Sequence, residues 1–134
     1  MATVTIGNRF CGPPDSGNGG YVCGLVAAAA MQPVAVRLKK PPPLATSLDL
    51  AEHDGVLQLR QGDEVIAEAR PDPVDLGVPV LPDHAEAVIA SLRYTGFAEH
   101  AFPGCFVCGP RGMAGDGLRI FAGPLSDGRG VAAP

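Results

Sequence analysis

Ser16-Gly17-Asn18-Gly19-Gly20-Tyr21-Val22-Cys23-Gly24-Leu25-Val26-Ala27-Ala28-Ala29-Ala30-Met31 decides the fold, because here a glycine-rich turn runs directly into a long apolar segment. We predict a helix over residues 20–31, with Asp15 or Ser16 as its N-cap. The side chains are apolar or small on all sides, and no charged residue follows until Arg37. Such a helix needs a surface that wraps around it, so we expect a curved antiparallel sheet that buries it.

The glycines of this stretch have two expected roles. Those that precede the helix let backbone N–H groups approach a ligand closely, which makes the helix start a potential anion site. Gly24 lies inside the expected helix, where glycine costs about 1 kcal/mol against alanine. We therefore expect a packing need for a small residue at Gly24.

Alternation of apolar and polar residues predicts strands on both sides of this helix. Asp54-Gly55 and Gly62-Asp63 are hairpin turn signals between them, and the prolines at 41–43 interrupt the run. One helix followed mainly by strands indicates an α+β fold, with the helix on one face of an antiparallel sheet. The expected strands cover residues 3–6, 34–39, 44–53, 57–60 and 65–69.

The second half of the chain is less regular. Residues 71–82 form a proline-punctuated connector that should run extended across a surface. Asp83 is the expected N-cap of a helix over residues 84–94. Residues 118–122 alternate like a strand, and residues 127–130 resemble a hairpin turn.

Composition and charge limit the classes of function. The 134 residues include five Phe, two Tyr and no Trp, so the core must be aliphatic. The net charge is −4 and the only basic cluster is Arg37, Lys39 and Lys40, which argues against nucleic acid as a partner. The apolar run is too short to span a membrane, and the N-terminus lacks the features of a signal peptide. We expect a cytoplasmic protein with no membrane partner.

Three stretches of the sequence are distinctive, namely Gly17–Leu25, Val36–Leu44, and Cys105–Pro110 with Gly117–Ile120. Together they resemble the hot-dog fold, thioesterase-like superfamily. The resemblance implies a double hot-dog parent, with one hot-dog domain over residues 1–71, a linker with a short helix over residues 72–101, and the start of a second, incomplete repeat over residues 102–134. On this interpretation the Cys-Phe-Val-Cys-Gly-Pro segment opens the second repeat.

The same resemblance implies an acyl-CoA thioester as ligand, bound near the helix start between two units of a homodimer or higher homo-oligomer. We expect no cofactor and no metal at this site. Backbone amides of Gly19, Gly20 and Tyr21 would polarise the thioester carbonyl. Asn18 would orient the thioester, and Asp15 or a partner-chain carboxylate would activate water.

Two features depart from the family pattern. Asn18-Gly19-Gly20 occupies the place of a His-Gly-Gly triplet, and the helix position of the expected acid, near Ala27, is apolar. These departures favour binding over turnover, since an oxyanion site without a base does not activate water. The alternative is therefore a non-catalytic hot-dog module for acyl-ligand binding or assembly.

Each candidate residue also has a structural interpretation. Asn18-Gly19-Gly20 fits a tight turn with a helix cap, and Asp15 fits a cap better than a base. Arg37, Lys39 and Lys40 fit a solvated strand face as well as a site for the phosphates of coenzyme A.

The four cysteines leave several alternatives open. In a reducing compartment they are expected to be thiols. Cys105 and Cys108 are spaced like half a zinc knuckle, for which Cys11 and His100 are the remaining candidate ligands. A redox pair and a pair of small apolar residues are the other two interpretations, of which we favour the last.

Overall fold

The structure is a computed structural model that describes residues 2–112 and 114–134. The chain forms two compact units, the first ending at Asp75 and the second covering Leu76–Pro134. Residues 84–91 pack with the C-terminal hairpin inside the second unit. The short helix therefore belongs with the C-terminal segment, whereas the sequence assigned it to a separate linker ending at residue 101.

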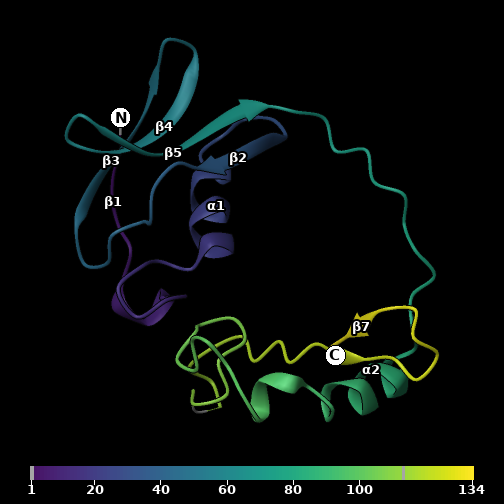
Figure 1. Cartoon of the computed structure of the whole chain (residues 1–134). Coiled ribbons are helices and arrows are strands. Elements are labelled where there is room, and N and C mark those ends of the chain that lie inside the picture. The colour runs from purple at the N-terminus through teal and green to yellow at the C-terminus, as the bar shows by residue number, and fades with distance from the viewer. Residues whose placement is uncertain (1, 113) are drawn as a thin grey trace. The chain divides into compact units, whose positions relative to one another are not determined.

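The first unit is a five-stranded antiparallel sheet with one α-helix, as the α+β prediction requires (Figure 1). Its strand order is β1-β3-β4-β5-β2, so β1 and β2 lie at opposite edges. Helix α1 connects these two edges, and the chain must therefore cross one face of the sheet. The elements are β1 Ala2–Thr5, a 3-10 turn Asn8–Phe10, α1 Gly19–Ala27, β2 Val34–Leu38, β3 Ser47–His53, β4 Val56–Gln61 and β5 Glu64–Pro71.

The core of this unit is aliphatic, as predicted. Strand β3 shows why, because Leu48 and Leu50 are buried while Asp49 between them is exposed. The same alternation in β4 buries Leu59 completely. The largest fully buried side chains are Ile6, Val22, Val26, Leu48, Leu59 and Ile66.

Helix α1 differs from the prediction in length, cap and burial. It starts at Gly19 with Asn18 as N-cap and ends at Ala27, so Asp15 and Ser16 do not cap it. Val22 and Val26, one turn apart, are its buried residues. Gly20, Gly24 and Ala28 are exposed, because the sheet covers only one side of the helix.

The expectation for Gly24 was wrong as well. A Cβ atom built at Gly24 would meet no heavy atom within 4 Å. The small residue therefore answers no packing need inside this unit.

Both predicted hairpin turns of the sheet are confirmed. Asp54 and Gly55 have φ angles of 51° and 75° between β3 and β4, the left-handed conformation that this dipeptide tolerates. Gly62, with φ 57°, lies in the β4–β5 turn. Arg60 holds that turn by donating from its Nη2 to the carbonyl oxygen of Asp63 at 2.6 Å.

The second unit has a short helix and a small hairpin. Asp83 caps α2, His84–Ser91, as predicted, and exchanges hydrogen bonds with Glu86 in a capping box. A 3-10 turn, Thr95–Phe97, follows. Strands β6, Gly123–Pro124, and β7, Val131–Ala132, pair around the turn predicted at residues 127–130.

Two predicted strands of the second unit are wrong. Residues 118–122 form no strand, because Arg119 has a φ of 54° that breaks the extended run. Instead, Leu118 N–H donates to the carbonyl of Phe106 and Ile120 N–H to that of Val107, both at 2.9 Å. Residues 105–108 form a tight turn and are not the opening strand of a second repeat.

The connector between the units has no helix or strand from residue 72 to residue 83. Its apolar side chains are between 71% and 83% exposed, namely Val74, Leu76, Val78, Val80 and Leu81. Among the residues that the structure describes, no helix has both the length and the apolar character needed to cross a bilayer.

Candidate functional site

The loop before α1 is fixed by backbone hydrogen bonds to two other parts of the first unit. Gly17 N–H donates to the Pro42 carbonyl at 2.8 Å, and Asn18 N–H donates to the Phe10 carbonyl at 2.7 Å. A Cβ atom at Gly17 would lie 3.0 Å from Val22 Cγ2. Glycine at this position therefore allows the loop to lie directly against the core and the proline segment.

An open hollow of about 460 Å³ lies beside this loop. Ser16, Gly17 and Gly19 line it from the helix start, together with Pro13, and residues 38–42 line it from the end of β2. The structure therefore brings together two sequence features that are twenty residues apart, the glycine turn and the lysine pair Lys39-Lys40.

The amides at the helix start divide into two kinds. Tyr21 N–H donates to the Asn18 side-chain oxygen at 3.1 Å, and Val22 N–H donates to the Asn18 carbonyl. The amides of Gly19 and Gly20 make no hydrogen bond to another described residue. Of the predicted oxyanion donors, Gly19 lines the hollow and retains a free amide, whereas the amide of Tyr21 is already engaged.

The two predicted catalytic side chains do not form a catalytic arrangement. Asn18 Oδ1 is occupied by the N-cap hydrogen bond, which supports the structural interpretation of this residue. Asp15 is exposed and is not part of the lining of the hollow. Ala27 closes the helix, and no carboxylate stands on α1.

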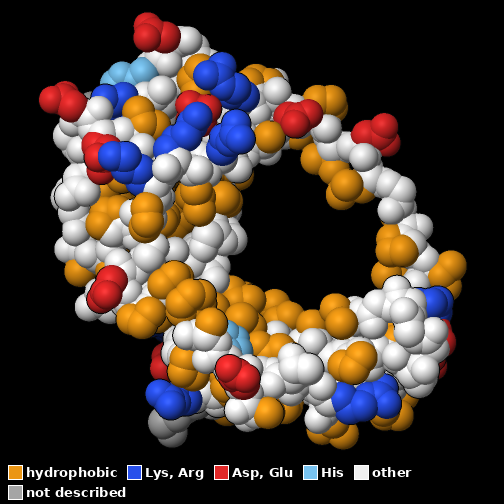
Figure 2. All heavy atoms as spheres, in the orientation of Figure 1, with side chains coloured by type: hydrophobic (Ala, Val, Ile, Leu, Met, Phe, Trp, Pro, Cys, Tyr) orange, Lys and Arg blue, Asp and Glu red, His pale blue; other side chains and the backbone are white. Residues whose placement is uncertain are grey.

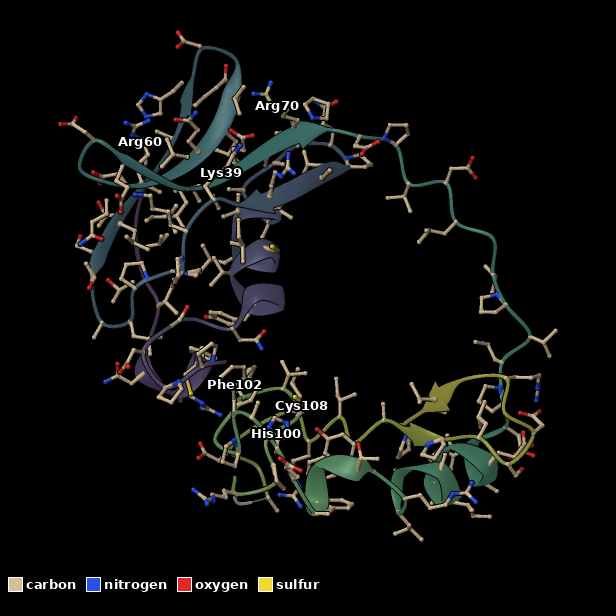
Figure 3. The ribbon with its side chains drawn as sticks, viewed as in Figure 1. Lys39, Arg60, Arg70, His100, Phe102 and Cys108 are labelled. Carbon is tan, nitrogen blue, oxygen red and sulfur yellow. The ribbon has the colours of Figure 1, made fainter. Side chains whose placement is uncertain are left out.

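The lysines next to the hollow are paired with carboxylates of β5. Lys39 Nζ lies 2.9 Å from Glu68 Oε1, and Lys40 forms an ion pair with Glu64. The hydrogen bond from Lys39, together with the charges of Lys39, Arg70 and Arg37, lowers the pKa of Glu68. Three cations therefore act on one carboxylate of the β2–β5 pair, and Figure 3 labels two of them, Lys39 and Arg70.

Arg37 stands directly opposite Glu68 in the β2–β5 register and does not line the hollow. Arg70 Nε lies 3.8 Å from Glu68 Oε1. Figure 2 shows Lys and Arg side chains gathered with acidic ones on this part of the first unit. The sequence analysis missed Glu68 and Arg70, because only the pairing of β2 with β5 brings them next to the basic cluster. The alternating pattern of β5 was the one signal in the sequence that could have placed them on this face of the sheet.

The cysteines do not assemble a metal centre within the described chain. Cys105 and Cys108 have their sulfur atoms 3.6 Å apart, and His100 Nδ1 accepts a hydrogen bond from Phe102 N–H at 2.9 Å. Over residues 2–112 and 114–134, no group of three or more His, Cys, Asp or Glu side chains is placed to hold a metal ion. On α1, partial burial raises the pKa of the Cys23 thiol.

No protein-family model, no characterised protein and no solved structure matches this chain.

Proposed function

We propose that the first unit is a hot-dog-like, thioesterase-like module that binds an acyl-CoA thioester at the start of α1. The observation that carries the proposal is the hollow in which Gly19 and the Lys39-Lys40 pair meet. The free Gly19 amide is suited to the thioester carbonyl, and the lysines are suited to the phosphates of coenzyme A. The sheet with its single crossing helix is compatible with this fold.

The ion pairs of Lys39 and Lys40 affect how tightly the phosphates of coenzyme A can bind. Lys39 and Lys40 are 39% and 52% exposed at their side chains, so a phosphate can reach them. A phosphate must, however, compete with Glu68 and Glu64 for the same ammonium groups. We expect micromolar or weaker binding that falls as the salt concentration rises.

A calorimetric titration with a panel of short and long acyl-CoAs tests the proposal. Replacing both lysines by glutamine should weaken binding at least about tenfold, the effect of losing about 1.4 kcal/mol. Arg129→Gln, which changes a cation of the second unit, is the matched control and should leave the affinity unchanged. Equal affinity of all three proteins, or no heat with any acyl-CoA, would reject the proposal.

Hydrolysis is the second candidate function, and release of free thiol from the same acyl-CoAs measures it. Asp15 directly precedes the glycine-rich turn, and activity that disappears in Asp15→Ala would support the enzyme. The occupied Asn18 side chain and the exposed Asp15 favour binding without release. Tight binding with no thiol release would identify a binding module.

Assembly into a homodimer, or a higher homo-oligomer, in the cytoplasm completes the proposal. The exposed apolar flank of α1 and the open edges β1 and β2 are the surfaces that a second copy would cover. Light scattering of the full chain tests this directly. A monomer at all accessible concentrations would count against the hot-dog assignment.

A further inference from the structure

The second unit holds two thiols close together. Cys105 and Cys108 lie in one turn with their sulfur atoms 3.6 Å apart. Cys105 is 9% exposed, and Cys108 is partly exposed. No third metal ligand joins the pair among the residues that the structure describes. The chemistry available to the pair alone is that of a dithiol.

Backbone hydrogen bonds hold the turn in the shape that brings the thiols together. Cys105 N–H donates to the Phe102 carbonyl and Gly109 N–H to the Cys105 carbonyl, both at 2.9 Å. A Cβ atom at Gly109 would lie 2.4 Å from the Cys105 nitrogen. Glycine is therefore required for the backbone to fold back on itself after Cys108.

The distance between the sulfur atoms is short enough for side-chain movement alone. A disulfide bond is about 2.05 Å long, so the sulfurs must approach by about 1.5 Å. Rotation about χ1 of one cysteine moves a sulfur by more than this distance. Side-chain rotation can therefore supply the approach that the two sulfur atoms need.

The surroundings of Cys108 slow the reaction without preventing it. Burial, followed by the hydrogen bond and charge of Cys105, raises the pKa of the Cys108 thiol. Tyr94 donates from its hydroxyl to the Cys108 carbonyl at 3.1 Å. A thiol with a raised pKa is mostly protonated at neutral pH, unlike the activated thiolates of disulfide oxidoreductases.

We propose that Cys105 and Cys108 are a reversible oxidation site that closes to an intramolecular disulfide when it meets a small-molecule disulfide. The Cys108 thiolate, which is the more accessible, attacks one sulfur of the oxidant, forms a mixed disulfide and releases one thiol. Cys105 then attacks the Cys108 sulfur and releases the second thiol. The two protein protons end on the two released thiols, the protein dithiol is oxidised, and the oxidant is reduced.

The closed form would stabilise a unit whose core is small. Among the described residues of this unit, the buried apolar ones are only Ala87, Ala90, Cys105 and Phe121. A cross-link that includes one of these four constrains the unfolded chain directly. We expect the oxidised second unit to unfold at higher urea than the reduced one.

The test uses the full chain carrying Cys11→Ser and Cys23→Ser, both in the first unit, so that Cys105 and Cys108 are its only thiols. The protein is incubated with glutathione mixtures from fully reduced to fully oxidised, then alkylated in acid and weighed by mass spectrometry. We expect a mass loss of about 2 Da, protection of both thiols, and reversal by dithiothreitol. The reaction should be faster at about pH 9 than at about pH 7, since more thiolate is present.

Single variants in the same background identify the order of events. Cys105→Ser should stop at a mixed disulfide on Cys108, whereas Cys108→Ser should react more slowly, because Cys105 is buried. Circular dichroism of each variant confirms that it is folded. Two alkylatable thiols after full oxidation, or disulfides only between chains, would overturn the proposal. A zinc ion bound with the thiols protected from oxidation would also overturn it, in favour of a metal site.

Discussion

At the residue scale, Gly17 is the glycine of the first unit where an added Cβ would make the closest contact. An added Cβ would meet Val22 Cγ2 at 3.0 Å, Ile6 Cγ2 at 3.2 Å and Pro42 Cβ at 3.4 Å, all in a buried place. We expect Gly17→Ala to reduce the free energy of unfolding by about 1–3 kcal/mol, the usual cost of overpacking a core. Urea unfolding followed by circular dichroism measures it.

Gly24→Ala is the matched control for this substitution. Gly24 lies in α1, directly after the loop that contains Gly17, and it is exposed with space around an added Cβ. We expect it to stabilise the protein by about 0.5–1 kcal/mol, because alanine favours the helix. Equal effects of the two substitutions would show that the close approach at Gly17 does not exist.

Asn18 is a second residue whose role can be separated by mutation. Its side chain caps α1, so Asn18→Ala should cost about 1 kcal/mol of stability. Asn18→Asp keeps the cap and adds a negative charge at the helix start, so it should retain the stability. Thermal unfolding of both variants checks this, and loss of stability in Asn18→Asp would argue against the cap.

The same pair of variants bears on the proposed ligand. A carboxylate at residue 18 would repel the phosphates and the developing oxyanion of a thioester. Asn18→Asp should therefore bind acyl-CoA more weakly than the wild type while remaining equally stable. Unchanged binding would place the ligand away from the start of α1.

At the element scale, the pairing of β2 with β5 makes stability depend on pH. The pKa of Glu68 is lowered in the folded state, mainly by the hydrogen bond from Lys39 and further by the charges of Lys39, Arg70 and Arg37. The ionised carboxylate therefore stabilises the fold above the ordinary glutamate pKa, near 4.5, and this contribution is lost as the pH falls through the lowered folded value. Glu68→Gln should lose stability at neutral pH and show a smaller further loss in acid.

Urea unfolding at about pH 7 and at about pH 3 measures the difference in the free energy of unfolding between Glu68→Gln and the wild type at each pH. Glu52→Gln, an exposed glutamate on β3, is the control and should follow the wild type. If the stability of both variants depends on pH as that of the wild type does, the ion pair between Glu68 and Lys39 does not stabilise the fold in solution. The experiment belongs at low salt, because the pairs are partly exposed and are screened by ions.

Most of the sheet could be predicted from the sequence because its strands carry period-two patterns bounded by strong turn signals. Leu48 and Leu50 in β3, and the Asp54-Gly55 turn after it, show both signals. The burial of Ile66 does not follow from the alternating pattern. The register shift at Leu59 and Arg60 lets Ile66 and Ala67, which are neighbours, both be buried.

The misplaced elements fail for other physical reasons. Helix α1 ends at Ala27 because the polyalanine run beyond it has no buried face to pack against the sheet. Residues 118–122 alternate like a strand, but the left-handed Arg119 and hydrogen bonds to the cysteine turn replace strand pairing. These are tertiary effects that no local pattern encodes.

The candidate site was predictable only in part. The glycine turn and the lysines were visible in the sequence, and the hollow joins Gly19 to Lys39 and Lys40. The engagement of the Asn18 side chain and the carboxylates of β5 depend on three-dimensional contacts. Pairing between distant strands therefore decides how much free positive charge the lysines offer.

At the scale of the whole molecule, the division into two units predicts two separable folding reactions. The first unit contains its own fully buried aliphatic core, and its sheet is complete at Pro71. The connector after it has no helix or strand, and its apolar side chains are largely exposed. We expect a protease with broad specificity to cut the native chain first between residues 72 and 82.

A fragment that ends at Asp75 tests the independence of the first unit. It should give the β-rich circular dichroism of the five-stranded sheet and unfold in one cooperative urea transition, because it retains the whole aliphatic core. In the full chain, the midpoint of that transition should match the fragment within error. A fragment that is unfolded at all concentrations would contradict an autonomous unit. A fragment that folds only above a threshold concentration would instead show that the exposed flank of α1 and the edges β1 and β2 need a second copy.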